Sequence, residues 1–272
     1  MTFCHRTFIL IAALSWSFAF TAEAKTYLSA KRPSHLSFAQ ISSVLDVGTE
    51  ARLSPSGSNA NDPEDAYSSR QSGKDFREKK SKLKVVTWPA EKSFEKAFQK
   101  VRDSRILKED VDFPRRPTWL YPDDGCFARA EVTSKELQGL GYPAPSKIFA
   151  FGDLKAKTKE HPAGFITWWY HVVVGYRVGN EVLVIDPSID ARKPMKLEDW
   201  IQAMGGRVDL SVCQASAIDP DSKCLSEPPI SKNDALELQS PFLSEEWKRL
   251  SGLGRNPTKE LGEEPPWLTP NH

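Results

Sequence analysis

The sequence has few cysteines and almost no net charge. Its 272 residues include 4 cysteines, and 37 Lys and Arg side chains balance 36 Asp and Glu side chains to a formal charge of +1. A chain with neither a basic nor an acidic excess has no electrostatic field that would attract a polyanion. We therefore expect no nucleic-acid partner. The length suits one sizeable domain or two small ones.

Several motifs of enzyme chemistry are missing as well. The sequence contains no glycine-rich phosphate loop and no Gly-x-Ser-x-Gly elbow. Beyond the first 24 residues the histidines are His35, His161, His171 and His272, and their spacing matches no zinc site. We expect no metal and no cofactor, and we interpret His161, which lies in a Pro/Gly loop, as a loop residue.

A long apolar run occurs only near the N-terminus. Residues 8–20 are apolar, follow a weakly positive start and precede Ala22-Glu23-Ala24, a small-x-small cleavage pattern. This arrangement predicts a secretory signal peptide over residues 1–24, cleaved after Ala24, with a retained N-terminal anchor as the alternative. No later run reaches the ~18 apolar residues of a membrane span. We expect a secreted or periplasmic protein, monomeric and without a membrane partner after cleavage.

Cleavage would remove Cys4 and leave three cysteines. The economical pairing in an oxidising compartment joins Cys213 to Cys224 across a short loop and leaves Cys126 free. A free thiol in an exported protein is typical of a reactive group. Pairing between two molecules or simple burial are the alternatives.

Composition divides the rest of the chain. Residues 25–80 are predicted to end in a linker, because residues 54–82 are rich in Ser, Gly, Asn, Asp, Pro and Lys and cannot bury a core. The basic cluster at residues 77–82 is either a protease-sensitive site or a solvated linker. Residues 81–225 form the predicted catalytic domain. Residues 226–272 form a Pro-rich tail with an apolar patch at 242–250, either packed on the domain or disordered.

Periodicity predicts the elements of this domain. Strands are expected at residues 83–88, 147–151, 166–178 and 181–186, and helices at 90–106, 126–140 and 197–204, with a short helix at 36–47 also compatible with the pattern. The helix at 126–140 follows a loop, and Gly141 provides its stop. Asp124 is the expected N-cap. Cys126 would then lie at the positive end of a helix, which favours a thiolate with a pKa below about 8.5; a buried packing cysteine is the alternative.

Two strands offer partners for that thiol. If Gly179-Asn180 is a two-residue hairpin loop, Val178 pairs with Glu181, and Asp186 shares a face of the sheet with His171. Their Cα atoms would be roughly 7–8 Å apart, a distance that an imidazole and a carboxylate can bridge. A structural histidine and a strand-ending aspartate are the alternatives.

The chemistry of these groups assigns the roles. Cys126 is the predicted nucleophile, His171 the general base and acid, and Asp186 the residue that orients the imidazole. The backbone N–H of Cys126 is a candidate oxyanion donor. By strand parity Trp169 shares the face of His171 and could line a substrate channel or only pack across strands, and Tyr121 is a second candidate for substrate binding.

Four motifs resemble the bacterial protein-glutaminases: residues 121–130 around Cys126, Gly152-Asp153-Leu154-Lys155-Ala156, Trp168-Trp169-Tyr170-His171-Val172 and Ile185-Asp186-Pro187-Ser188. The resemblance spans roughly residues 113–200. It implies an α+β fold in which the nucleophile helix packs on an antiparallel sheet, like the core of transglutaminases and papain-like enzymes. It also places the family's catalytic cysteine, histidine and aspartate on Cys126, His171 and Asp186. Phe127 and Glu131 depart from the family pattern, where Tyr and His are expected.

The resemblance implies a thiol-dependent hydrolase that converts protein-bound glutamine to glutamate with release of ammonia. Its partners would be proteins with exposed glutamine, and its own residues 25–80 would block the cleft of a zymogen. A transglutaminase or a cysteine peptidase would use the same three residues, and a non-catalytic protein-binding module is a further alternative.

Overall fold

The computed structural model describes residues 29–31, 51–53, 82–108, 111–205, 208–218, 220, 224 and 228–262. The predicted signal peptide, the short helix at 36–47 and the linker up to residue 81 lie outside these ranges.

The longest strand is the one with the strongest β pattern in the sequence. β5 (Phe165–Val178) is almost continuously buried, as expected of a run of β-branched and aromatic residues inside a sheet. It pairs with β4 (Ser146–Lys157) on one side and β6 (Glu181–Ile185) on the other. Together with β1 (Ala51–Leu53), β7 (Met195–Lys196) and β8 (Val208–Cys213), these strands form one six-stranded sheet in the order β1-β8-β4-β5-β6-β7. Every pairing is antiparallel, so the predicted antiparallel sheet is confirmed.

The turn between β5 and β6 has the predicted two residues. Val178 pairs with Glu181, and Val174 pairs with Ile185. Gly179 has φ +59°, in the left-handed region that a tight hairpin turn of this kind requires. The register on which the position of Asp186 depends is therefore confirmed.

β4 is longer than predicted. The sequence indicated a strand that stops at Gly152-Asp153, but β4 continues to Lys157 through a register shift between Phe151 and Leu154. A bulge of this kind interrupts the alternation of side chains without ending the strand. The predicted strand at 83–88 is wrong: within it only Thr87 forms a bridge, parallel to Arg177.

Three helices occupy the places that periodicity indicated. α3 (Phe94–Asp103) has Ser93 as its N-cap, and the side chain of Ser93 accepts a hydrogen bond from the N–H of Lys96. α4 (Cys126–Gly139) packs against β5, and α5 (Leu197–Ala203) contacts β6 and β4. Gly141 has φ +79° just beyond α4, which is the predicted helix stop.

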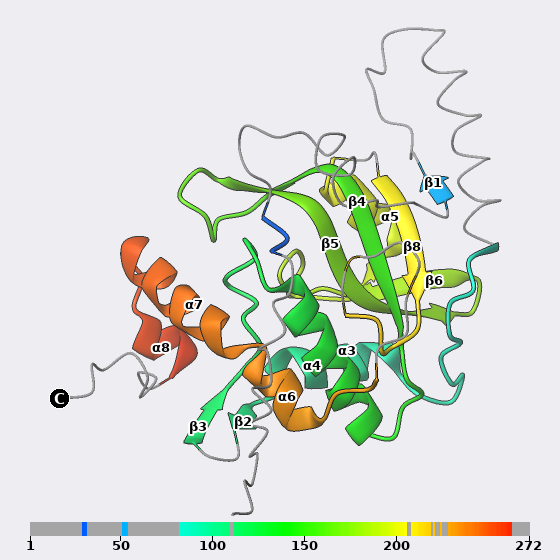
Figure 1. Ribbon diagram of the computed structural model, residues 1–272, viewed down its shortest axis with the longest axis horizontal. Coiled ribbons are helices and arrows are strands. Elements are labelled where there is room, and N and C mark those ends of the chain that lie inside the picture. The colour runs from blue at the N-terminus through cyan, green and yellow to red at the C-terminus, as the bar shows by residue number, and fades with distance from the viewer. Residues whose placement is uncertain are drawn as a thin grey trace, which may run out of the picture.

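The sequence did not indicate the remaining elements. β2 (Ile106–Lys108) and β3 (Val111–Arg115) form a separate two-stranded sheet. The C-terminal region contains α6 (Lys232–Glu237), α7 (Ser240–Gly252) and α8 (Pro257–Leu261). Figure 1 shows these three helices gathered on one side, with α6 next to α4 and the six-stranded sheet beyond α4.

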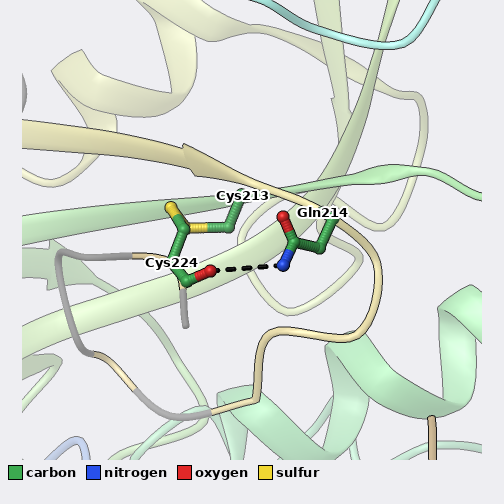
Figure 2. The surroundings of a disulfide bond; sticks show 3 residues. All are labelled: Cys213, Gln214 and Cys224. Atoms are coloured by element: carbon green, nitrogen blue, oxygen red, sulfur yellow. Dashed lines mark hydrogen bonds between the residues drawn. A yellow bond between two sulfur atoms is a disulfide. The ribbon is translucent and has the colours of Figure 1, made fainter. Parts of the chain in front are cut away.

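The predicted disulfide is present. Cys213, the last residue of β8, is bonded to Cys224 with Cα atoms 5.1 Å apart. Figure 2 shows the side-chain amide of Gln214 donating to the carbonyl of Cys224, a hydrogen bond of 3.2 Å. The bridge closes a loop of 11 residues at the end of the sheet. In the part of the chain that the structure describes, no helix is long and apolar enough to cross a membrane.

Candidate active site

The side chains of His171 and Asp186 meet as the hairpin register predicted. Nε2 of the imidazole lies 2.8 Å from Oδ2 of the carboxylate, and both side chains are buried. Asp186 follows the last residue of β6, one step beyond the pair formed by Val174 and Ile185. The carboxylate therefore reaches His171 diagonally across two neighbouring strands.

The carboxylate of Asp186 has three further hydrogen bonds that fix its orientation. The indole N–H of Trp200, on α5, donates to Oδ2 at 2.8 Å, while the hydroxyl and the backbone N–H of Ser188 donate to Oδ1 at 2.5 and 3.2 Å. Burial by itself would raise the pKa of Asp186. The positive charge on His171 and the hydrogen bonds from His171, Ser188 and Trp200 outweigh burial and lower the pKa to about 2. Asp186 therefore stays ionised.

Sequence reasoning missed the contribution of Trp200. The helix that carries it was predicted at 197–204, but a tryptophan on a short amphipathic helix gives no signal for a carboxylate partner. The contact with Ser188 was weakly indicated by the sequence, because an aspartate in a turn often accepts a hydrogen bond from the backbone two residues later, as in an Asx turn.

The aromatic ring next to His171 is not the one that strand parity indicated. The ring of Trp168 stacks on the imidazole, with ring centres 4.4 Å apart and an angle of 8° between the planes. The indole of Trp169 instead contacts Phe151 and Tyr170. Strict alternation along β5 therefore does not hold between Trp168 and His171, opposite the place where the register of β4 and β5 shifts.

Cys126 is the first residue of α4, is fully buried and forms no disulfide. Its sulfur accepts a hydrogen bond from the backbone of Val172, the residue after His171, so the thiol lies next to the histidine segment of β5. On the imidazole, Nδ1 has no hydrogen-bond partner among the described residues. Thus one ring nitrogen is held by Asp186, and the other is available for proton transfer.

The expectation of a thiolate at the helix start is wrong for this state of the protein. Complete burial raises the pKa of Cys126 to about 12, although the positive charge of Arg129 and the Val172 hydrogen bond act in the opposite direction. The N-terminus of a helix stabilises an anion only modestly, whereas removing a thiolate from water costs more. Cys126 is therefore a thiol in this structure.

Asp124 is not the N-cap of α4. Gly125 is in that position with φ +72°, and no side chain caps the helix. The carboxylate of Asp124 instead accepts hydrogen bonds from the N–H of Gly125 at 2.7 Å, from the N–H of Ala30 at 2.9 Å and from the hydroxyl of Ser29. The predicted capping residue therefore binds a distant segment of the chain.

That segment, residues 29–31, lies along β5 next to the site. Lys31 bridges to Trp168 in antiparallel fashion, and the backbone N–H of Trp169 donates to the carbonyl of Ala30 at 3.2 Å. The indole N–H of Trp169 donates to the carbonyl of Ser29 at 2.7 Å. Ala30 is completely buried. Residues 29–31 thus lie between Asp124 and Trp169. Asp124 precedes Cys126 by two residues, and Trp169 precedes His171 by two residues.

Arg129 is a buried cation that sequence reasoning did not single out. Its Nη1 donates to the carbonyl groups of Thr118, Tyr121 and Asp124 at 3.5, 2.9 and 2.7 Å. Its Nη2 has no partner among the described residues, and the side chain lines a cavity of about 10 Å³ with His171 and Asp186. An arginine one helical turn after the thiol could have been noticed from its spacing alone.

Tyr121, the second candidate for substrate binding, is mostly buried. It lines a surface hollow of about 240 Å³ with residues of α7 and Pro162. Burial raises the pKa of its phenol to about 12. Among the described residues, no three His, Cys, Asp or Glu side chains are grouped so that they could hold a metal ion.

Comparison with known proteins gives independent information on the family. Residues 94–204 match the sequence model of a family described as glutaminase. This segment contains Cys126, His171 and Asp186, and the match confirms the resemblance to the protein-glutaminases indicated by the motifs. No match was found among curated proteins.

Solved structures of protein-glutaminases are also similar to the chain. A crystal structure of a pro-protein-glutaminase is 26% identical, with 53% of this chain and 54% of that one covered and a TM-score of 0.42. A crystal structure of protein-glutaminase is 24% identical, with 54% and 82% covered and a TM-score of 0.41. The NMR structure of protein-glutaminase from Chryseobacterium proteolyticum is 23% identical, with 55% and 85% covered and a TM-score of 0.44. The chain thus spans about half the length of the pro-protein.

Proposed function

We propose that this chain, whose residues 94–204 match the glutaminase family, is a hydrolase that deamidates glutamine side chains in proteins. The observation that carries the proposal is the hydrogen bond between His171 and Asp186. Val172, the residue after His171 on β5, donates a backbone hydrogen bond to the sulfur of Cys126, so the thiol lies beside this pair. A free thiol, an imidazole with one unoccupied nitrogen and a buried carboxylate are the parts that thiol-dependent acyl transfer needs.

The reaction would proceed in two halves. His171 takes the proton of Cys126 as the sulfur attacks the side-chain carbonyl carbon of glutamine, and then gives that proton to the departing ammonia. The product of this half is a γ-glutamyl thioester on Cys126. In the second half His171 takes a proton from water as the water oxygen adds to the thioester; the C–S bond then breaks, His171 returns the proton to the sulfur, and glutamate leaves. Throughout, Asp186 stabilises the charged imidazole and holds its orientation.

The high pKa of Cys126 suits a general-base mechanism rather than a stored thiolate. A thiol with a pKa of about 12 is protonated at neutral pH, so its proton has to leave as the sulfur attacks. Opening the site to solvent would weaken the cause of that rise, because burial is its largest contributor. We therefore expect the thiol to become more reactive if removal of the peptide at residues 29–31 opens the neighbouring site to solvent.

Residues 29–31 support the further proposal that the N-terminal segment inhibits the enzyme. The segment forms hydrogen bonds with the carboxylate of Asp124 and with both N–H groups of Trp169. These polar groups could otherwise bind the main chain of a substrate protein. In this proposal residues 25–80 are a pro-segment, and cleavage near the basic cluster at 77–82 releases it. Trp169 then binds substrate backbone, a role that differs from the channel wall inferred from parity.

Export fits the same proposal, in which residues 1–24 are a signal peptide and the mature protein is a secreted or periplasmic monomer. The disulfide between Cys213 and Cys224 supports export, since such bonds persist in oxidising compartments. Edman sequencing of the exported protein tests the signal peptide: a first residue of Lys25 is expected, and an intact N-terminus would contradict it.

The test of the activity uses two forms of the protein, residues 25–272 and residues 83–272, with a glutamine-rich protein as substrate. Released ammonia and the mass of each substrate peptide are measured. Deamidated glutamine with intact peptide bonds is expected, whereas shorter fragments would indicate a peptidase and a covalently added amine a transglutaminase. Cys126→Ser should abolish the reaction, and persistent ammonia release in that variant would exclude the proposed nucleophile.

The same two forms test the pro-segment. Iodoacetamide should alkylate Cys126 faster in the shorter form, because loss of residues 29–31 would open the neighbouring site to solvent, and ammonia release should rise in parallel. Ser29→Ala with Asp124→Asn in the longer form is a second variant, expected to move both rates toward those of the shorter form. Equal alkylation rates in all forms would rule out inhibition by residues 29–31.

A further inference from the structure

The C-terminal helices hold the loop that leads to Cys126. This loop, residues 118–125, is called the nucleophile loop below. Gln239 accepts hydrogen bonds from the backbone N–H and the hydroxyl of Thr118 at 3.3 and 3.2 Å, and Glu246 accepts from the N–H of Leu120 at 2.9 Å. Both acceptor side chains belong to fully buried residues. These contacts come from residues outside the segment that matches the glutaminase family, residues 94–204.

Arg249 on α7 is the most connected of these residues. Its guanidinium forms a two-point ion pair with Asp123, Nη1 to Oδ2 at 2.7 Å and Nη2 to Oδ1 at 2.8 Å. Nη1 also donates to the carbonyl of Glu160 at 3.0 Å, and the guanidinium lies 5.1 Å from the centre of the Tyr121 ring. Asp123 is buried, and Arg249 is the nearer of its two partners, since Nε2 of His161 lies 3.4 Å from Oδ1.

The guanidinium of Arg249 connects two loops that are far apart in the sequence, through Asp123 in one and Glu160 in the other. Asp123 precedes Cys126 by three residues, and Glu160 lies in the loop between β4 and β5, which leads into the strand of His171. A planar guanidinium with several fixed donors can set the relative position of two backbones, which a single point charge cannot do. Trp168 adds to the same arrangement, because its indole N–H donates to the carbonyls of Pro122 and Asp123 at 2.9 and 3.1 Å.

Phe242, near the start of α7, touches the last residue of the nucleophile loop. A Cβ atom placed on Gly125 would lie 2.6 Å from the Phe242 ring, so helix and loop are in direct contact. The Phe242 ring also meets the edge of Phe127, with ring centres 5.8 Å apart. The start of α7 thus contacts both the start of α4 and the loop before it.

We propose that α7 positions the nucleophile, and that Arg249 is its principal positioning residue. Through Asp123 and Glu160 it fixes the nucleophile loop relative to the β4–β5 loop, and so fixes Cys126 relative to the strand of His171. The proposal rests on the proposed function for its kinetic consequence. The structural consequence, an ordered nucleophile loop, stands independently of which reaction the thiol performs.

Positioning has a signature that general stabilisation lacks. A misplaced nucleophile lowers kcat while KM changes little, because substrate binding is retained and the attack geometry is lost. It also changes hydrogen exchange locally, in the two loops that Arg249 joins, and leaves the sheet protected. A residue that only stabilises the fold would change exchange throughout the domain.

The experiment compares Arg249→Met and Arg249→Lys in the chain of residues 25–272 and in its cleaved form. The methionine variant keeps an apolar stem and removes the fork, and the lysine variant keeps the charge without the two-point geometry. Lys232→Met is the matched control, since it removes the exposed ion pair between Lys232 and Glu136 that links α6 to α4 away from the loop. Exchange of peptides covering residues 118–126, 158–164 and 170–185 is followed by mass spectrometry, together with alkylation of Cys126.

In Arg249→Met, exchange at residues 118–126 and 158–164 should rise by about tenfold, with residues 170–185 unchanged. The rate of Cys126 alkylation should change as well, and kcat should fall by about 10- to 100-fold with KM within about threefold. Arg249→Lys should fall between wild type and the methionine variant, and it serves as the reporter if the latter does not fold. The control should match wild type in every measurement.

Unchanged exchange in both loops, or an equal rise over all three peptides, would overturn the positioning role. A wild-type protein that releases no ammonia would defeat the proposed function instead, and the exchange and alkylation measurements would still decide the inference about Arg249.

Discussion

The indole N–H of Trp200 donates a 2.8 Å hydrogen bond to Oδ2 of Asp186, the same oxygen that faces Nε2 of His171. One carboxylate oxygen thus receives two donors from different elements, while Ser188 satisfies the other oxygen. With all four groups buried, the imidazole has little freedom to rotate.

Trp200→Phe should reduce activity without abolishing it. The variant keeps most of the packing of the ring and removes one donor to Asp186, so kcat for ammonia release is expected to fall by about tenfold, the cost of one hydrogen bond. KM should stay nearly constant. Steady-state kinetics on a glutamine-containing protein provide the measurement, and a kcat equal to that of wild type would mean that the Trp200 hydrogen bond does not orient the site.

Asp186→Asn should be far more damaging. The amide would offer a donor where His171 needs an acceptor, and this favours the wrong imidazole tautomer, an effect worth about 10⁴-fold in kcat where the geometry is otherwise retained. Near-UV circular dichroism should show an intact fold. Retention of more than a tenth of the wild-type kcat would remove Asp186 from the proposed triad.

Asp186 should also contribute to the acid stability of the protein. Its folded pKa of about 2 lies below the ordinary value of 3.8, so ionised Asp186 stabilises the fold above about pH 4, and this contribution is lost as the pH falls toward 2. A shift of this size corresponds to about 2 kcal/mol in the free energy of unfolding. Urea denaturation at pH 6 and at pH 2–3 should show a smaller pH dependence for Asp186→Asn than for wild type. The exposed-carboxylate control Glu245→Gln should follow wild type, and identical pH profiles for all three proteins would contradict the prediction.

The disulfide should stabilise the protein without taking part in the reaction. Closing a loop of 11 residues corresponds to about 2–3 kcal/mol in the chain-entropy description. The double variant Cys213→Ala, Cys224→Ala should lose about that much stability in urea, with kcat changed by less than about threefold. A collapse of kcat in folded double variant would show that the end of β8 acts on the site.

Gly125→Ala should be poorly tolerated at the start of α4. The residue has φ +72°, and an added Cβ would lie 2.6 Å from the ring of Phe242. The backbone cost of about 1–2 kcal/mol and the overpacking cost of about 1–3 kcal/mol should add. Phe242→Leu should relieve only the overpacking cost. Gly125→Ala is therefore expected to destabilise the protein less in the Phe242→Leu background than in the wild-type background. Equal costs of Gly125→Ala in both backgrounds, measured by thermal denaturation, would show that the Phe242 contact is not limiting.

The sequence by itself determined the features that depend on near neighbours in the chain. The two-residue turn at Gly179-Asn180 determined the register of β5 and β6, and period-two alternation then brought Asp186 to His171. The same local rules located α3, α4 and α5. Counting cysteines identified the pair Cys213–Cys224 and the free thiol of Cys126.

Tertiary structure decided what local rules cannot contain. Alternation along β5 indicated Trp169, whereas the ring of Trp168 stacks on His171, opposite a register shift that depends on the pairing of β4 and β5. The pKa of Cys126 followed burial rather than the helix end, and Asp124 bound residues 29–30 instead of capping, because each group responds to everything that surrounds it. Likewise, the Pro-rich tail, in which the sequence showed an apolar patch at 242–250, contains α7, whose Arg249 is paired with Asp123 across 126 residues of sequence. Hydrogen bonds and desolvation depend on distance in space, and separation along the chain gives no measure of it.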